Sequence, residues 1–299
     1  MDMLRITNLH KRFGDKQVLQ GVELAVPEHS IFGFIGQNGA GKTTTMKAIL
    51  GLLRVDSGHI EVGGETVVYG NTATNRMIGY LPDVPAFYPY MTAPEYLRFC
   101  GQLCGMDRDE IEGRSRELLE LVGLAEEKHR IQGFSRGMKQ RLGIAQALLH
   151  RPKLLICDEP TSALDPMGRQ EILHILQSLR QQTTVLFSTH ILSDVERICT
   201  DAAFLHNGAI TMQGTISQLK ARYRSELYRL ELGDDAACAA LQAAFPLLQP
   251  AQQRCLTLDG QQLCTASVLS FIGEKRLPLV KWEKAEPTLE TLFMEVTGA

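Results

Sequence analysis

The sequence predicts an α/β protein in which a parallel sheet interleaved with helices is followed by a small α+β domain. An apolar run over residues 31–35 ends in glycines and precedes a helical segment, which is the order strand, loop, helix. Strands and helices then alternate over residues 154–188, and this alternation is typical of a parallel sheet. Beyond about residue 224 the strands and helices are short. We therefore expect a main domain over residues 1–220 and a small accessory domain over residues 225–299.

The composition is that of an ordinary folded globular chain. Of its 299 residues, 44% are hydrophobic and 22% are charged, which excludes a disordered or collagen-like protein. The formal net charge of −3 gives no basic surface for nucleic acid, so nucleic acid is not an expected partner. The seven cysteines show no CxxC spacing, and buried reduced thiols are the simplest interpretation. No apolar run approaches the ~18 residues of a membrane-spanning helix, so the chain is not expected to span a membrane by itself.

The first element of the main domain is an antiparallel β subdomain. Residues 4–9 and 18–26 have the pattern of short, half-buried strands. Gly14 and Asp15 supply a turn between them, which makes the two strands a hairpin. Phe13 then lies at the tip of this hairpin.

A helical subdomain is expected over about residues 92–150. Thr92 and Glu95 form a capping box in front of an apolar stripe, so a helix begins there. A second helix covers residues 108–122 and a third covers residues 135–149.

The remaining elements follow from shorter patterns. Asn207 and Gly208 are the pair favoured in a tight hairpin, because both central residues of such a turn need positive φ. The main domain closes near Gly214 after this hairpin. The expected elements of the accessory domain are strands over 227–232, 255–258 and 279–282 and helices over 235–244, 266–273 and 289–296.

Residues 36–43 fit the phosphate-loop pattern G-x-x-x-x-G-K-[ST], and they lie between a strand and a helix as that loop requires. Lys42 would reach the β and γ phosphates of a nucleotide, and Thr43 would place its hydroxyl on Mg²⁺. A chance glycine-rich turn is the alternative, and the flanking strand and helix argue against it. The residues expected to bind the nucleotide here are Gly36, Asn38, Gly39, Ala40, Gly41, Lys42, Thr43 and Thr44.

Two adjacent carboxylates follow the apolar strand over residues 154–157. They lie at its carboxyl end, where parallel sheets bind their ligands. Asp158 suits Mg²⁺, and Glu159 suits the water that attacks a phosphate. Apolar runs followed by Asp-Glu are common at solvated strand ends, so the functional interpretation depends on the phosphate loop upstream.

Residues 134–141, Phe-Ser-Arg-Gly-Met-Lys-Gln-Arg, resemble the signature motif of the ABC ATPase family. In that family the Ser and Gly, here Ser135 and Gly137, begin a helix whose N-terminus faces the γ-phosphate held by the opposite subunit. Physically, a Ser at a helix N-cap leaves unpaired N–H groups and a positive dipole end suited to an anion. A plain helix cap is the alternative, and it has the same geometry without a ligand.

The resemblance extends to three further positions. Residues 162–165 resemble the D-loop that crosses the dimer interface, which places Asp165 there. His190 resembles the switch histidine after a strand, which would contact the γ-phosphate, although a lone His in this place is more often structural. Phe13 matches the aromatic position that stacks on adenine, where Tyr is commoner, and a packed hairpin tip is nearly as good an interpretation.

Two segments depart from the family pattern. Residues 79–83 resemble the Q-loop, but the chain has Asp83 where the family usually has Gln. The resemblance implies that Asp83 contacts the nucleotide and Mg²⁺, with an added negative charge whose effect on the attacking water stays open. In the signature motif Arg136 and Met138 replace the usual Gly and Gln, while Ser135 and Gly137 are retained.

Taken together, the resemblance implies an ATP-binding and ATP-hydrolysing subunit with a phosphate-loop NTPase core of ABC ATPase type. Its cofactors would be ATP and Mg²⁺, and its catalytic residues Lys42, Glu159 and His190. Its partners would be a second nucleotide-binding subunit, in a homodimer, and an integral membrane permease. It would then be cytoplasmic and peripheral on the inner face of the cell membrane. Residues 286–293 resemble the C-terminal helix of a bacterial exporter-type branch, so export is the expected direction.

The segment over residues 84–91 is rich in aromatic residues and suits a docking patch for the membrane partner, with Tyr88, Tyr90 and Met91 as contact candidates. Local packing against the helical subdomain is the alternative. A soluble ABC ATPase acting in translation or DNA repair is the competing function, although such proteins usually carry two cassettes or long insertions. A scaffold without turnover would be favoured if Asp83 disables the site. The transported substrate is not predicted.

Overall fold

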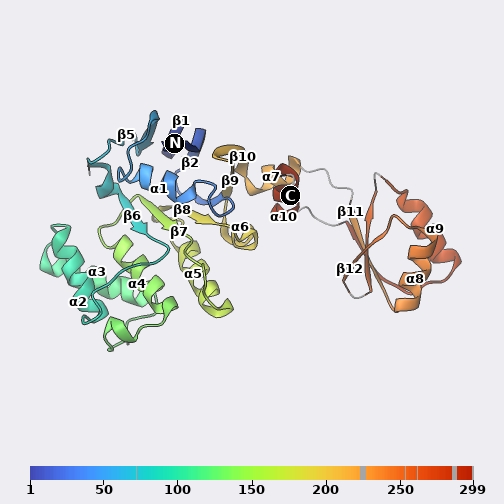
Figure 1. Ribbon diagram of the computed structural model, residues 1–299. Coiled ribbons are helices and arrows are strands. Elements are labelled where there is room, and N and C mark those ends of the chain that lie inside the picture. The colour runs from blue at the N-terminus through green and yellow to red at the C-terminus, as the bar shows by residue number, and fades with distance from the viewer. Residues whose placement is uncertain (72, 223–226, 253, 261, 285–287, 298–299) are drawn as a thin grey trace. The chain divides into compact units, whose positions relative to one another are not determined.

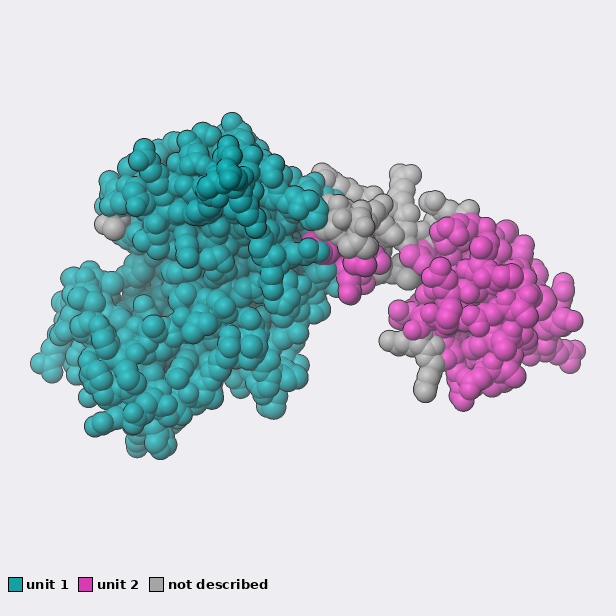
Figure 2. All heavy atoms as spheres, viewed as in Figure 1, with its two compact units in different colours: residues 1–219, 296–299 teal, residues 220–295 magenta. Residues whose placement is uncertain are grey.

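In the computed structural model the chain forms two compact units (Figures 1 and 2). The first comprises residues 1–219 with 296–299, and the second comprises residues 220–295. The structure describes residues 1–71, 73–222, 227–252, 254–260, 262–284 and 288–297. The stretch that links the two expected domains, 221–224, lies partly outside the described residues.

The first unit contains ten strands among its described residues. Helical segments lie between them, and α7 follows the last strand and extends into the first residues of the second unit. The strands are β1 (Asp2–Phe13), β2 (Lys16–Pro27), β3 (Ile31–Ile35), β4 (Ser57–Val62), β5 (Glu65–Thr66), β6 (Ile78–Leu81), β7 (Leu154–Asp158), β8 (Thr184–Thr189), β9 (Asp201–His206) and β10 (Ala209–Thr215). The helices are α1 (Lys42–Ile49), η1 (Ala73–Met77), α2 (Ala93–Leu103), α3 (Arg108–Leu121), η2 (Ile131–Gly133), α4 (Arg136–Leu148), α5 (Pro166–Ser178), α6 (Leu192–Ile198) and α7 (Ile216–Arg222).

Six of these strands form the central sheet, in the order β10-β9-β3-β8-β7-β6 (Figure 1). All neighbours pair in parallel except β10, which is antiparallel to β9. Every residue of β3, β7 and β8 is buried, as expected for strands of a parallel sheet covered on both faces. The predicted α/β fold is confirmed, and the carboxyl ends of β3, β7 and β8 meet at one edge of the sheet.

A second sheet, in the order β2-β1-β4-β5, is antiparallel throughout. The hairpin of β1 and β2 was expected, whereas β4 and β5 were not. One face of this sheet packs on β3 and α1, and each fully buried large apolar side chain there contributes about 1.5–3 kcal/mol. The cluster includes Leu4, Ile6, Leu9, Val22, Leu24, Phe32, Phe34, Met46 and Ile49.

The helices α2, α3 and α4 form the expected helical subdomain, and each begins at a side-chain cap. Thr92 and Glu95 make the capping box of α2, so this prediction is confirmed. The backbone and side chain of Thr92 donate to Glu95, and these bonds lower the pKa of its carboxyl group. Asp107 accepts from the backbone N–H of Glu110 at the start of α3.

Gly79 on β6 provides a test of how closely the sheet and α4 approach each other. A Cβ at this position would overlap the carbonyl oxygen of Ala147 and lie 3.0 Å from Pro152. We expect Gly79→Ala to lower the free energy of unfolding by about 1–3 kcal/mol, because backbone must shift to make room. Thermal denaturation measures this. Gly113→Ala is the control: its Cβ meets nothing within 4 Å inside α3, and it should stabilise by about 0.5–1 kcal/mol. Equal effects of the two changes would contradict the close approach.

The second unit has the order β11 (Leu227–Leu232), α8 (Asp235–Ala244), β12 (Gln249–Gln252), β13 (Cys255–Asp259), α9 (Thr265–Glu274) and β14 (Leu279–Lys284), followed by α10 (Leu289–Thr297). Its sheet has the order β12-β13-β11-β14 and is antiparallel, which is the split βαβ arrangement of ferredoxin-like folds. The α+β tail is therefore confirmed, and only β12 was not expected. Of the C-terminal motif, residues 286 and 287 lie outside the described residues.

No helix in the described part of the chain is long and apolar enough to cross a bilayer.

Candidate functional site

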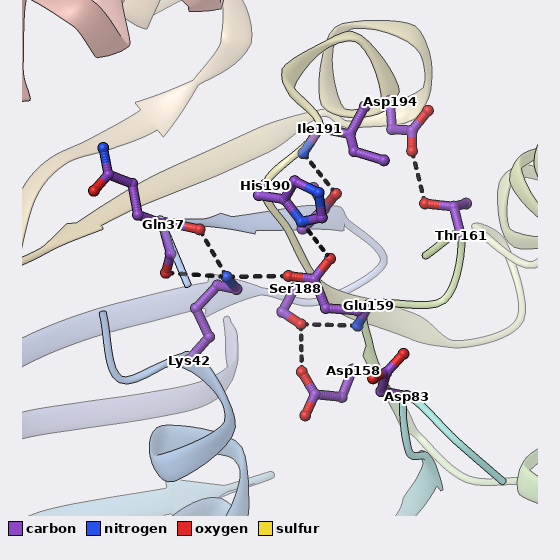
Figure 3. Close-up of polar contacts among 12 residues, drawn as sticks. Gln37, Lys42, Asp83, Asp158, Glu159, Thr161, Ser188, His190, Ile191 and Asp194 are labelled. Carbon is purple, nitrogen blue, oxygen red and sulfur yellow. Dashed lines mark hydrogen bonds and ion pairs between the residues drawn. The ribbon is translucent and has the colours of Figure 1, made fainter. Parts of the chain in front are cut away.

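The phosphate loop connects β3 to α1. Gly41 has φ of 114°, and a Cβ there would lie 2.8 Å from Leu19, so this position requires glycine. Lys42 follows as the first residue of α1 and is only 6% exposed. Its Nζ donates to the carbonyl oxygens of Gly36 at 2.7 Å and Gln37 at 3.3 Å (Figure 3). The ammonium group is thus held inside the loop.

Asp158 at the end of β7 lies between the phosphate loop and β8. Its Oδ2 accepts a hydrogen bond from the Thr43 hydroxyl at 2.8 Å. Its Oδ1 accepts one from the Ser188 hydroxyl at 2.6 Å (Figure 3). The side chain is 3% exposed. A buried carboxylate beside a hydroxyl presents the hard oxygen ligands that Mg²⁺ prefers.

Glu159 occupies the centre of the cluster (Figure 3). Its φ of 48° turns the chain sharply at the end of β7. One carboxylate oxygen lies 3.0 Å from Lys42 Nζ, and the other lies 2.9 Å from His190 Nδ1. Its backbone N–H donates to the Ser188 hydroxyl at 2.9 Å. The structure therefore brings Lys42, Glu159 and His190, which were each predicted separately, into direct contact through the Glu159 carboxylate.

This cluster borders a cavity beside the phosphate loop. The cavity has a volume of about 160 Å³ and is lined by Val18, Gln37, Asn38, Gly39, Gly41, Lys42, Thr43, Thr44 and Glu159. A larger cavity of about 480 Å³ shares Val18 and the tip of the loop with it and extends to His206 and Gly208. Phe13 lines neither cavity: its ring is 50% exposed at the hairpin tip, with Lys11 Nζ 5.1 Å from the ring centre.

The loop after β7 is tied to the loop after β8 through a buried acid. Asp194 on α6 is 1% exposed, and it accepts from the Thr161 hydroxyl at 2.8 Å (Figure 3). Its other oxygen lies 2.6 Å from Arg169 on α5. Asp165 caps α5 by accepting from the backbone N–H of Gly168. The residue before the segment that resembles a D-loop is therefore linked to α6.

Ser135 accepts from the backbone N–H of Met138 at 3.2 Å and so caps α4, as the sequence predicted. Neither Ser135 nor Gly137 lines the cavities at the phosphate loop. In the described part of the chain, no hydrogen bond or ion pair links them to Lys42, Glu159 or His190. Within one chain the signature residues and the phosphate loop form separate groups.

Asp83 follows β6 and is half-exposed. Its carbonyl oxygen accepts from Gln140 Nε2 at 2.8 Å, and its carboxylate lies 3.5 Å from the guanidinium of Arg136. No described hydrogen bond or ion pair joins it to Thr43 or Asp158. The structure thus places Asp83 against α4.

Three features of this region were not found in the sequence. Ser188 bridges Asp158 and Glu159. The sequence shows a Ser two residues before His190, but no role was predicted for it. Asp194 gave no signal beyond one acidic residue in a short helix. Tyr80 lies near the end of β6, and burial, with the nearby carboxylates of Asp158 and Asp83, raises its pKa to about 12. It is therefore a neutral phenol at physiological pH.

The residues present fit a divalent cation that is shared with a substrate. Around no point of the described structure do three or more His, Cys, Asp or Glu side chains gather as a self-sufficient metal site. Mg²⁺ is usually held by one or two carboxylates together with substrate phosphates. The Thr43 hydroxyl oxygen and Asp158 Oδ2, which lie 2.8 Å apart, match that donor set.

Comparison with known proteins places these features in a family. A family model described as ABC transporter matches residues 19–162. The chain is 45% identical to the uncharacterized ABC transporter ATP-binding protein YxlF of Bacillus subtilis (strain 168), with 99% of this chain and 100% of that protein covered. It is 34% identical to the bacitracin transport ATP-binding protein BcrA of Bacillus licheniformis, covering 99% and 97%. It is 33% identical to the linearmycin resistance ATP-binding protein LnrL of Bacillus subtilis, covering 99% and 98%.

Solved structures agree with the fold over about three quarters of the chain. One described as an ATP binding subunit of an ABC transporter superposes with a TM-score of 0.65 and 32% identity, covering 74% of this chain and 92% of that chain. An ATP-binding cassette of an ABC transporter in its ADP conformation gives a TM-score of 0.67, covering 73% and 92%, and at 24% identity it supports the fold alone.

Proposed function

This chain belongs to the ABC transporter family as an ATP-binding subunit and ATPase, and we propose that two copies of it hydrolyse MgATP at shared sites to drive a separate membrane protein. One observation carries the proposal: Glu159 lies between Lys42, at 3.0 Å, and His190, at 2.9 Å, at the mouth of the phosphate loop. A carboxylate held between a phosphate-binding cation and an imidazole is placed to accept a proton from an attacking water.

Each residue of the cluster has a proposed task in hydrolysis. Lys42 binds the phosphates, and its Nζ exchanges Glu159 for phosphate oxygens when ATP enters. Glu159, released from that ion pair, orients the water and takes its proton, and His190 contacts the γ-phosphate. Thr43 and Asp158 would hold Mg²⁺, whereas Asp83, which contacts α4 and neither of these residues in the described structure, is not assigned to the metal. When bound, Mg²⁺ neutralises charge that develops on the phosphate oxygens.

The signature residues support a head-to-tail dimer. Ser135 and Gly137 begin α4 but do not line the cavity at Lys42, so a single chain presents an incomplete site. In the proposed dimer the N-terminus of α4 in one copy faces the γ-phosphate held by the other, where its free N–H groups and dipole favour an anion. Asp165, at the start of α5, is placed at the same interface, and Phe13 stacks on adenine.

The membrane partner is proposed to dock near the aromatic segment over residues 84–91. Tyr88 and Tyr90 are 45% and 59% exposed and lie against each other, with ring centres 5.8 Å apart. Exposed aromatic rings are enriched in protein interfaces. Met91 follows directly and completes the patch. Through this partner the chain would lie at the inner face of the cell membrane.

Export is the proposed direction of transport. The supporting observation is the similarity over nearly the full chain to two proteins whose names state bacitracin transport and linearmycin resistance. Resistance to such a compound is consistent with its removal from the cell. The small domain over residues 225–299 is proposed to be an accessory domain, outside the catalytic site.

The proposed function predicts that the purified chain releases phosphate from ATP only when Mg²⁺ is present. It also predicts that the tagged chain, isolated from gently solubilised membranes, retains a protein with several membrane-spanning helices. Phosphate release is measured by a coupled assay with EDTA as the control. A chain that binds ATP without turnover, alone and with its membrane partner, would contradict the proposal.

A further inference from the structure

The segment around Asp83 lies along one face of α4. Arg136, Gln140 and Gly143 follow one another at helical spacing and therefore share this face. A Cβ at Gly143 would lie 2.5 Å from the Leu81 side chain, so the backbone of α4 and the segment around Asp83 approach closely there. One turn earlier, the buried Gln140 donates to the carbonyl oxygen of Asp83 at 2.8 Å. Arg136, one helical turn before Gln140, faces the Asp83 side chain.

The Asp83 carboxylate is incompletely satisfied. Its Oδ1 is shielded from solvent, and within the described residues it accepts no hydrogen bond. The group that approaches this oxygen is the guanidinium of Arg136, with Nη2 at 3.5 Å. A shielded carboxylate oxygen without a donor is unfavourable, so a neighbouring positive charge has a direct effect on it.

Asp83 follows the strand that lies beside the end of β7. Leu81, the last residue of β6, pairs with Cys157 on β7, so Asp83 comes two residues after β6, next to the strand end that carries Asp158. The site therefore carries Asp158 and Glu159 and, close by, a third carboxylate. A nucleotide triphosphate is itself strongly negative, and an uncompensated carboxylate in this region would repel it.

We propose that Arg136 is a positioning residue that compensates the charge of Asp83 and holds its carboxylate against α4, so that the triphosphate site is not made more negative. Because the inference assumes that MgATP binds beside Asp158, at the end of the neighbouring strand, it rests on the proposed function. Both side chains are about half exposed, at 45% and 47%, and such pairs contribute little to folding stability. The pair should therefore affect turnover and leave the melting temperature nearly unchanged.

Second-site rescue tests this proposal. In the full-length chain, Arg136→Gln should lower kcat/KM for MgATP by about three- to tenfold, mainly through a higher KM, because Asp83 is left unpaired. Adding Asp83→Asn to Arg136→Gln should restore kcat/KM to that of Asp83→Asn alone. The control is Arg76→Gln, which removes an exposed arginine from a pair with Glu65 at 2.9 Å and should change nothing. A defect of Arg136→Gln that persists undiminished beside Asp83→Asn would overturn the inference.

Ionic strength provides a readout that a purely structural role would not change. The screening length falls from about 10 Å at 0.1 M salt to about 3 Å at 1 M, so the Arg136→Gln defect should shrink towards none at high salt. A defect independent of salt would count against charge compensation.

Failure of the proposed function is recognised separately, because the wild-type chain would then show no turnover. Hydrogen exchange of the backbone amides of Asp83, Val84 and Ala86 still tests the pair in that case: it should be faster in Arg136→Gln than in wild type and unchanged in Arg76→Gln. Equal exchange in Arg136→Gln and wild type would overturn the inference.

Discussion

Glu159→Gln is expected to reduce ATP hydrolysis by about 10²–10⁴-fold while ATP binding is retained, because the amide keeps the shape of the side chain and loses its ability to accept a proton. The structure indicates that this substitution should remove the proton acceptor and keep the contacts of the side chain. The carboxylate lies 3.0 Å from Lys42 and 2.9 Å from His190, and glutamine can keep a hydrogen bond to both. Its neutral amide also frees Lys42 from a competing ion pair, so the affinity for ATP should stay equal or rise.

The variant should therefore accumulate an ATP-bound dimer. Light scattering with MgATP measures the dimer, and single-turnover phosphate release measures the chemical step. Glu171→Gln is the matched control: this carboxylate is 50% exposed on α5, and its loss should leave hydrolysis within about twofold of wild type. Hydrolysis by Glu159→Gln at the wild-type rate would show that another group takes the proton.

Patterns that are local in sequence predicted most of the fold. The strand, loop and helix over residues 31–49, the capping box of α2 and the hairpin at Asn207 each depend on residues a few positions apart. The strands β4, β5, β6 and β12 were not predicted, because each has six residues or fewer and shows no sustained alternation of apolar and polar residues. The helix α6 has only seven residues, which is too few to show a helical period.

In the site, too, residues of contiguous motifs were predicted, whereas contacts between distant segments were not. Lys42, Thr43, Asp158 and Glu159 were found because contiguous motifs bring their chemistry with them. The bridge from Ser188 to Asp158 depends on the register of β7 and β8, in which these two residues are direct partners, and register between distant strands is not readable from either strand alone. Likewise Asp83 and Arg136 were noticed as two separate departures, and only the packing of α4 on the segment after β6 brings them together.

Lys42→Ala is expected to have the second large effect, a loss of about 10²–10³-fold in turnover together with weaker nucleotide binding. The substitution removes the preorganised positive charge that stabilises the negative charge developing on the phosphate oxygens. It also leaves Glu159, which is 14% exposed, without its cation at 3.0 Å. Breaking a largely buried pair from one side is unfavourable, so a lower melting temperature should accompany the loss of activity.

These two consequences are separated by adding a second change. In Lys42→Ala with Glu159→Gln no unpaired carboxylate remains, so the melting temperature should recover while nucleotide binding stays weak. Lys47→Ala is the control within α1, since Lys47 is exposed in the last turn of the helix and its loss should alter neither quantity. Calorimetric titration with ATP and thermal denaturation measure the two effects. Wild-type ATP affinity in Lys42→Ala would mean that the backbone N–H groups of the loop alone hold the phosphates, and the ion pair with Glu159 would then be structural.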